Sequence, residues 1–451
     1  MINLSVEQPQ IGAAVSRRGF LRATFGGAGS LAALGQLHDS AQGSGGRRSD
    51  TAVIQIWLGG GPSHIDLYDL KPNAPRDFRG PYRPIATEQP GIDVCELLPK
   101  HAGIMPHLSV IRSLHHSSND HVAGTHWMQT GYFGATTPKP DQTHPSAGSI
   151  IAETQSADRS KVLPYVHVLP ELPIETYSQQ FRAAYLKSAY NPFEIRMPFP
   201  GYNASEHFEA RDLSTVAGLD LDRMDRRLSL RQQFDRTLRA AETADAHSAD
   251  YRRAYDLLSS QPIRRAFDLA EEKPAVRARY GSSGWGQAAL LCRRLVEAGA
   301  TFVTLNTDSS SNMWDNHVGI EKYFRIMLPA YDAMLSALVG DLVERGLYDR
   351  VVVLVWGEFG RTPRINDKAG RDHWGSAGCA LTGGGGLRVG QVIGATTSKG
   401  EEPSQRPIRP GDVLATLYEL VGVDPARQFT NHAGRPVPVL TDGEPIAELM
   451  P

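Results

Sequence analysis

The stretch that decides the fold is VVVLVWGEFGRTPRINDKAGRDHW, residues 351–374. Its first six residues, Val351 to Trp356, are apolar, uncharged and rich in β-branched side chains. Such a run predicts a strand buried on both faces of a parallel sheet, where polar and apolar residues need not alternate. The run stops at Gly357-Glu358, and the loop beyond it carries arginines and the pair Asp372-His373. Because open α/β sheets bind ligands beyond the carboxyl ends of their strands, this loop is a candidate metal or catalytic site. A loop whose charges only satisfy one another would look similar.

Size and composition indicate a globular protein. The chain has 451 residues, of which 41% are hydrophobic and 21% charged, enough for one large α/β domain or two smaller ones. The formal net charge of −2 argues against nucleic acid or an anionic membrane as the main partner. Cys95, Cys292 and Cys379 are too scattered for a disulfide framework or a thiolate zinc site. No apolar run reaches the roughly 18 residues of a membrane helix, so we expect no stable span in the mature protein.

The N-terminus carries the pattern of an export signal. Arg17 and Arg18 precede a weakly apolar stretch, rich in glycine and alanine, that extends to Leu37. A twin arginine before a mild hydrophobic region is typical of a Tat signal, and a basic disordered terminus is the alternative. We therefore expect residues 1–50 to be a Tat signal peptide and linker. The Tat translocase would be a partner during export, and the mature protein would be periplasmic or in the cell envelope.

A second strand end presents polar side chains. Thr51–Leu58 is a strand candidate that leads directly into Gly59–Gly61 and then Ser63, His64 and Asp66. Three glycines leave room for a ligand against the main chain. The spacing matches neither the dinucleotide fingerprint nor a P-loop, so both nucleotide-binding hypotheses are rejected. A tight turn capped by Ser63 and Asp66 is the alternative to a functional site.

The histidines of residues 114–127 form a third candidate group. His121 and Thr125 are four residues apart and share a face if this stretch is helical, and His126 follows directly. Any one of these histidines could be an ordinary core or surface residue, but four within fourteen residues favour a site.

Further along, strands and helices alternate. Ala300–Asn306 predicts another buried strand, followed by a polar loop with Asp315 and His317, which can reach one borderline cation such as zinc. Residues 170–200 are predicted to form an extended loop, and about 213–272 a charged helical insertion. The alternation points to one α/β domain with a mainly parallel sheet.

These stretches resemble the domain of unknown function 1501 family, an exported family similar to the alkaline phosphatase/sulfatase superfamily. The resemblance is carried, in order, by the twin arginine, WLGGGPSHID, THWMQTG, WDNH, GEFGRTP, GRDHW, the GGGG turn and DVLATLYELVGVDP. It covers nearly the whole chain, and the order and spacing agree as well as the motifs. It implies that residues 51–451 form an alkaline-phosphatase-like three-layer sandwich with a mainly parallel central sheet and the helical insertion.

The resemblance also implies ligands for one or two divalent ions. One ion would take Asp315, His317 and His373. Glu358, Asp66 and His121 are the remaining candidate ligands, although the Asp-His pair expected at a second ion reads Glu358-Phe359 here. The expected metal is zinc, with manganese or calcium as alternatives. The nucleophile position falls near residues 119–126, where Thr125 is the candidate hydroxyl, and no sulfatase Cys-x-Pro-x-Arg motif occurs.

Two functional hypotheses follow. The first is an exported metal-dependent hydrolase of phosphate or sulfate esters of small molecules or glycans, in which Arg361 or Arg371 binds the oxyanion. His64, His121 or His126 would transfer protons to the leaving group. The second is a non-catalytic exported protein that binds sulfated or anionic glycans in a degenerate cleft. A purely structural role, in which the polar loops only cap strands, predicts that no metal co-purifies.

Overall fold

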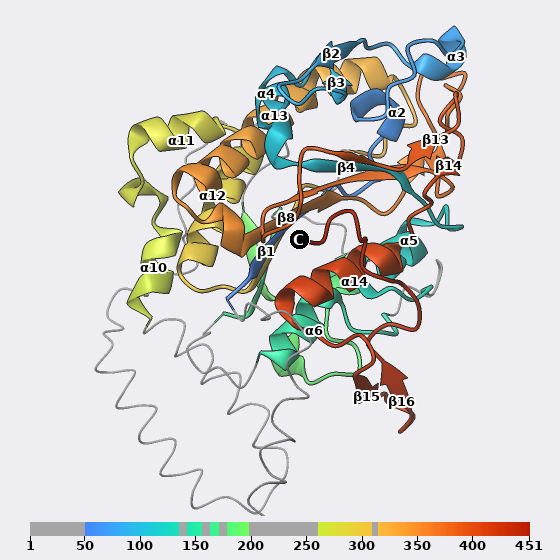
Figure 1. The fold of residues 1–451 in the computed structure, drawn as a ribbon. Helices are drawn as coiled ribbons and strands as arrows, with labels where there is room; N and C mark the ends of the chain where they lie inside the picture. Colours follow the sequence, from blue (N-terminus) through green and yellow to red (C-terminus); the bar gives the residue numbers. More distant parts are fainter. Residues whose placement is uncertain (1–49, 135–141, 156–162, 171–177, 198–259, 309–313) are drawn as a thin grey trace, which may run out of the picture. The chain divides into compact units, whose positions relative to one another are not determined.

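The structure is a computed structural model that describes residues 50–134, 142–155, 163–170, 178–197, 260–308 and 314–451 (Figure 1). The chain divides after Arg47, and all described residues belong to the unit Arg48–Pro451. The predicted Tat signal therefore lies outside the described residues, as does the helical insertion up to residue 259. The described end of that insertion is helical, with α10 (Gln261–Phe267) and the 3-10 helix η6 (Leu269–Glu271).

An eight-stranded sheet forms the centre of this unit, with strand order β12-β4-β11-β8-β1-β7-β5-β6. Only β11 runs against its neighbours, so the sheet is mainly parallel, as predicted. The strands in this order are Val392–Ile393, Ser109–Leu114, Gly378–Gly383, Val351–Trp356, Ala52–Trp57, Phe302–Asn306, Tyr165–Pro170 and Phe193–Met197. The last of these, β6, pairs with β5 and lies in the stretch that was predicted as a loop, so that prediction was wrong there.

The predicted central strand β8 is buried on both faces. Val351, Val353 and Val355 belong to one hydrophobic cluster, whereas Val352, Leu354 and Trp356 belong to the other. Successive side chains of a strand point to opposite faces, so each cluster fills one side of the sheet. This explains why the run needs no polar alternation.

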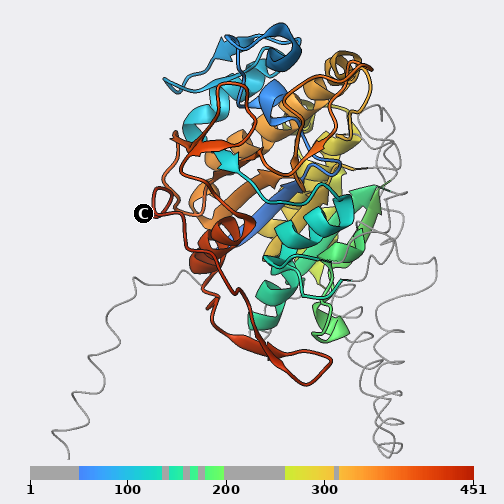
Figure 2. The ribbon, with the colours of Figure 1, turned by 90° about the vertical axis from the view of Figure 1, so that its right-hand side faces the viewer.

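Helices cover both faces and complete the three-layer sandwich (Figure 1). The first face packs against α4 (Pro99–Ile104), α12 (Gly284–Glu297) and α13 (Ile320–Glu344). The second packs against α6 (Ala147–Thr154) and α14 (Pro410–Val421), and α14 also contacts α5 (His121–Thr130) (Figure 2). Among the described helices, α13 alone is long and apolar enough to cross a membrane. Its apolar window is 61% buried in the protein, as in a core helix.

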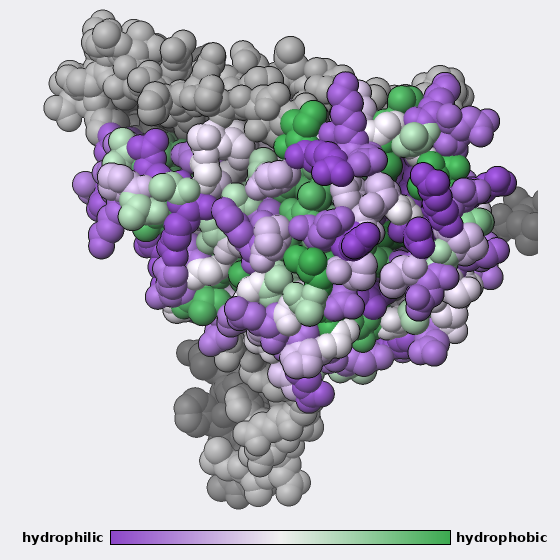
Figure 3. All heavy atoms as spheres, turned by 90° about the horizontal axis from the view of Figure 1, so that it is seen from above, coloured by the Kyte–Doolittle hydropathy of each residue, from purple (hydrophilic) through white to green (hydrophobic). Residues whose placement is uncertain are grey.

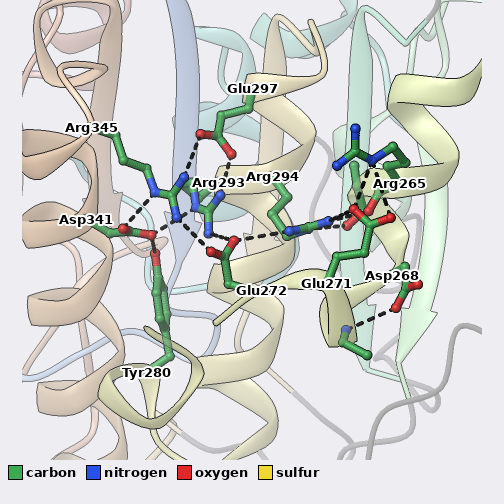
Figure 4. A network of polar contacts seen from close by, with 12 residues as sticks. Arg265, Asp268, Glu271, Glu272, Tyr280, Arg293, Arg294, Glu297, Asp341 and Arg345 are labelled. Carbon is green, nitrogen blue, oxygen red and sulfur yellow. Dashed lines mark hydrogen bonds and ion pairs between the residues drawn. The ribbon is translucent and has the colours of Figure 1, made fainter. Parts of the chain in front are cut away.

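A network of ion pairs fastens the helices of the first face to one another (Figure 4). Arg293 of α12 is fully buried and is bound by Glu272, Glu297 and Asp341. Glu272 also binds Arg345, with Nη2 2.8 Å from Oε1. Because each of these guanidinium groups already faces carboxylates, the network is structural.

The face seen in Figure 3 is mainly hydrophilic, with apolar residues in small groups between charged ones. Among the described residues the exposed large hydrophobic side chains are Phe133, Val318, Tyr323, Ile326 and Val343.

Candidate metal centre

The candidate site is assembled from strand ends that lie at one edge of the sheet. The neighbouring strands β8, β1 and β7 are parallel and in register, with Trp57 beside both Trp356 and Asn306. Their exits therefore deliver three loops to the same place. A fourth segment leaves β4, which has the same direction, and begins α5 at His121.

Asp315 is the point on which three histidines converge. Its Oδ1 lies 2.9 Å from Nε2 of His317 and 3.1 Å from Nε2 of His373. Its Oδ2 lies 3.4 Å from Nε2 of His121. The ligand atoms of His121, Asp315 and His373 all lie within 4.8 Å of one another. His317 packs against this group, with Nε2 3.0 Å from that of His373.

Each histidine is held by its other ring nitrogen. Nδ1 of His121 lies 2.6 Å from Glu358 Oε1, and Nδ1 of His317 lies 2.7 Å from Asp372 Oδ1. Nδ1 of His373 donates to the backbone oxygen of Asn119 at 2.8 Å. Because these oxygens accept, each Nδ1 carries a proton, and a metal ion bound at Nε2 would take the place of the second proton that Nε2 otherwise donates to Asp315.

This arrangement fits a divalent metal ion. Zinc bonds of about 2.0–2.1 Å to nitrogen place two tetrahedral ligands roughly 3.3 Å apart, close to the separations seen here. Two imidazole lone pairs at 3.0 Å repel each other unless a proton or a cation lies between them. Three imidazoles and a carboxylate suit zinc better than calcium, which takes oxygen ligands.

The charges of the cluster agree with this interpretation. Burial alone would raise the pKa of Asp315, but hydrogen bonds from His121 and His373 and the charge of Arg361 hold it well below its usual range. Burial alone would lower the pKa of His121, but hydrogen bonds to Asp315 and Glu358 raise it to about 9. The hydrogen bond from His317 lowers the pKa of Asp372. The carboxylates are therefore ionised near neutral pH and attract positive charge.

Comparison with known proteins gives the family. The model described as "Protein of unknown function (DUF1501)" matches residues 50–450. The chain belongs to the DUF1501 family. No curated protein matches the sequence.

Solved structures similar to this DUF1501 chain are remote. The lipoteichoic acid synthase LtaP from Listeria monocytogenes is 11% identical, with 87% of this chain and 75% of that chain covered and a TM-score of 0.39. A protein in the alkaline phosphatase superfamily from Vibrio parahaemolyticus is 11% identical, with 84% and 68% covered and a TM-score of 0.39. Alkaline phosphatase from the Antarctic bacterium TAB5 is 9% identical, with 82% and 98% covered and a TM-score of 0.37. Likeness at this level says nothing about the reaction.

Both arginines that were expected to bind an oxyanion are committed to the DUF1501 chain itself. Arg361 is fully buried, and its Nε donates to Gly61 O at 2.8 Å and its Nη1 to Arg371 O at 3.1 Å. Its Nη2 donates to Gly60 O and to Asp315. Arg371 is equally buried and pairs with Asp66, with Nε 2.7 Å from Oδ2. Arg361 therefore holds Asp315 in place, and neither guanidinium faces a ligand.

The structure does not place Asp66 and His64 with the cluster. Asp66 accepts from Ser63 Oγ at 2.6 Å in addition to Arg371, which is the capped turn considered as the alternative for this loop. His64 is buried, and its Nε2 donates to Gly400 O at 2.9 Å. Neither is among the partners of Asp315 in the described part of the chain.

Thr125 and His126 lie inside α5, and neither is among the partners of Asp315 in the described residues. Thr125 is fully buried one turn beyond His121, and its Oγ1 has no hydrogen-bond partner among the described residues. His126 donates from Nδ1 to Tyr132 O at 2.9 Å, and its Nε2 accepts the Thr143 amide at 3.2 Å. Burial lowers the pKa of His126 to about 4. His126 thus anchors a loop and is not placed to donate protons to a substrate at the cluster.

Two features of the centre were missed in the sequence. Asn119 holds His373 through its backbone oxygen and Gly375 N through Oδ1, at 2.6 Å. Asp372 orients His317, and its position beside His373 in GRDHW is the one signal that could have suggested this role.

Proposed function

We propose that this DUF1501 chain is an exported, metal-dependent hydrolase of phosphate or sulfate esters, acting on small molecules or glycans. The observation that carries the proposal is the convergence of Nε2 atoms from His121, His317 and His373 on Asp315. Zinc is the expected ion, and manganese is the alternative. The cluster around Asp315 provides for one ion, and a second ion at Glu358 has no comparable set of ligands among the described residues.

A bound zinc ion would supply a water of pKa about 7 and polarise the ester oxygen. The chain's own residues would keep this centre in shape. Glu358, Asp372 and Asn119 hold the three rings, and Arg361 holds the carboxylate of Asp315. Because Arg361 contacts Asp315 directly, it also limits how much negative charge the cluster presents.

Substrate would approach from the side of His317. Its side chain is 39% exposed and that of Asp372 is 54% exposed, whereas those of Asp315 and His121 are 11% and 13% exposed. Among the described residues the partners of Asp315 are three histidines and Arg361, with no hydroxyl or thiol. A metal-bound water is the nucleophile that this set of partners would supply.

The same observation favours a second candidate function, a non-catalytic exported protein that binds sulfated or anionic glycans. A centre with buried, committed arginines and no side-chain nucleophile among the described partners of Asp315 could hold an anionic ligand through its metal without converting it. Such a protein would retain zinc and bind glycans tightly with no turnover.

The export part of the proposal rests on Arg17 and Arg18, which lie outside the described residues. A periplasmic or cell-envelope location follows from a Tat signal. Replacing both arginines with lysine should leave the protein in the cytoplasm. Normal export of that variant would remove this part of the proposal.

The test of the activity is a panel of phosphate and sulfate esters offered to the purified, exported protein with and without added zinc. Hydrolysis that needs zinc and disappears in His373→Ala supports the hydrolase. Tight binding of a sulfated glycan without hydrolysis selects the binding protein. If neither is seen with a zinc-loaded protein, both candidate functions are wrong.

A further inference from the structure

We propose that Glu358 is the positioning residue of the metal centre: it holds His121 in the orientation that presents Nε2, and it is not itself a ligand. The inference rests on the proposed centre and deepens it, because the sequence analysis placed Glu358 among the metal ligands.

Glu358 joins three segments at the end of β8. Its Oε1 accepts from His121 Nδ1 at 2.6 Å and from the backbone N–H of Gly60 at 2.8 Å. Its backbone oxygen accepts from Nε2 of His116. The side chain has no exposed surface. Glu358 therefore ties the exits of β8 and β1 to the start of α5.

The packing leaves Glu358 little freedom. Gly124 of α5 lies so close that an added Cβ would be 3.2 Å from the backbone oxygen of Glu358 and 3.3 Å from its Cβ. Gly60 has a φ of +113°, a conformation that favours glycine, and this brings its N–H to the carboxylate. The position of Oε1 is thus fixed from two sides before any metal binds.

The fixed acceptor Glu358 Oε1 determines which ring nitrogen of His121 carries a proton. A carboxylate oxygen only accepts hydrogen bonds, so Nδ1 of His121 must carry the proton. The remaining nitrogen, Nε2, then faces Asp315 Oδ2 at 3.4 Å. Without Glu358 the ring of His121 could exchange tautomers and turn. Loss of such an outer partner typically weakens metal binding by about 10- to 100-fold.

The same contacts argue against direct ligation by Oε1. This oxygen already accepts two donors, and among the described residues Glu358 contacts the cluster through His121. The other oxygen, Oε2, is buried and has no hydrogen-bond partner among the described residues. If Oε2 bound a second ion, that ion would be lost on its own when Glu358 is replaced, and this outcome separates the two roles.

The experiment compares zinc affinity, by competition with a chromogenic chelator, in the wild-type protein, Glu358→Ala and Glu358→Gln. Glu358→Ala should raise the zinc Kd by about 10- to 100-fold with unchanged stoichiometry. Glu358→Gln keeps an acceptor oxygen and should stay close to the wild-type value. Asp332→Ala is the matched control for Glu358→Ala, since Asp332 holds His101 Nδ1 at 2.7 Å in a buried pair outside the centre. It should leave the zinc Kd unchanged.

A second readout follows the ring itself. In zinc-loaded protein labelled with ¹⁵N at histidine, the His121 signals should show a proton on Nδ1 in the wild type and in Glu358→Gln, and a mixture of the two tautomers in Glu358→Ala. An unchanged zinc Kd and tautomer in Glu358→Ala would overturn the proposal, as would loss of one of two bound zinc ions. If the wild type binds no zinc at all, the proposed function fails, whereas the Nδ1–H signal of His121 still tests the hydrogen bond to Glu358.

Discussion

The Nε2 atoms of His317 and His373 face each other across 3.0 Å, although 56 positions separate the two residues in the chain. Both rings are fixed from behind, His317 by Asp372 and His373 by Asn119. Neither ring can turn its nitrogen away without losing that hydrogen bond. The pair therefore needs a shared proton or a cation between its lone pairs, and Asp315 supplies the adjoining negative charge.

The three histidines should contribute unequally to metal binding. Nε2 of His373 lies near the ligand atoms of His121 and Asp315 and also near Nε2 of His317. His373 can therefore bind an ion together with Asp315 and either of the other two histidines. We predict that His373→Ala weakens zinc binding by more than the roughly 100-fold expected for an outer partner, and by more than His121→Ala or His317→Ala. Zinc titration of the three variants checks this order. Equal losses, or a larger loss in His317→Ala, would contradict it.

The loop after β1 should tolerate no side chain at Gly60. A Cβ there would lie 2.7 Å from the backbone nitrogen of Asp315, so Gly60→Ala must displace the ligand that the cluster shares. Gly299 has a similar φ of +99° but no described heavy atom within 4 Å, which makes Gly299→Ala the matched control. Both variants should lose about 1–3 kcal/mol of stability to backbone strain. Only Gly60→Ala should also weaken zinc binding. Equal zinc affinity in the two variants would show that the contact does not matter.

The buried ion pair between Asp66 and Arg371 should be structural. Both side chains have no exposed surface, and Nε lies 2.7 Å from Oδ2. Arg371→Met would leave a buried carboxylate without its charge partner, at a cost of about 3–5 kcal/mol. The exposed pair Arg406–Glu448, with side chains 44% and 40% exposed, gives the comparison. Arg406→Gln should cost at most about 1 kcal/mol. Denaturant unfolding of both variants is the measurement, and similar small losses would contradict the interpretation.

Stability should fall in mild acid because histidines are buried in the neutral form. His167 has no exposed surface and packs on Phe181, with ring centroids 4.6 Å apart. Burial, reinforced by the charges of Arg182 and Arg196, lowers the pKa of His167 to about 3.

Between that value and the unfolded value of about 6.5, the unfolded chain binds a proton that the native chain does not. The free energy of unfolding should therefore decrease by up to about 1.4 kcal/mol per pH unit as the pH falls through this window. In His167→Leu the free energy of unfolding should depend less steeply on pH, because one fewer proton is taken up on unfolding. A slope that stays the same in this variant would show that His167 is not the source.

The buried part of the fold was predictable from the sequence. β8 has the predicted bounds, Val351–Trp356. Six consecutive apolar residues between polar flanks are typical of a strand that is buried on both faces of a sheet. The sequence also predicts a late helix over Pro410–Val421, and α14 has these bounds, with proline at its start and Gly422 at its end. Prediction was weaker where signals were mixed. The sequence predicts a long helix over about Ile326–Glu344, whereas α13 begins at Ile320, because charged residues in its first turns hide the apolar period.

The site was harder to predict because motifs do not fix the direction of side chains in loops. Asp315, His317 and His373 were grouped in advance and do lie together. The sequence did not show that Arg361 would turn inward onto Asp315, since an arginine in a polar loop reads the same whether it binds a ligand or the protein. The hydrogen bonds that fix which ring nitrogen of each histidine faces Asp315 join residues far apart in the sequence. His121 and Glu358, for example, are 237 positions apart. Only the folded chain reveals such pairs.

The most direct test of the central claim is the metal content of the folded, exported protein purified without chelator, measured with His373→Ala alongside. The account predicts close to one equivalent of zinc, or of manganese in its place, in the wild type. It predicts little or none in the variant, whose circular dichroism should match the wild type. A folded wild-type protein that contains no metal and takes up none on titration would contradict the account.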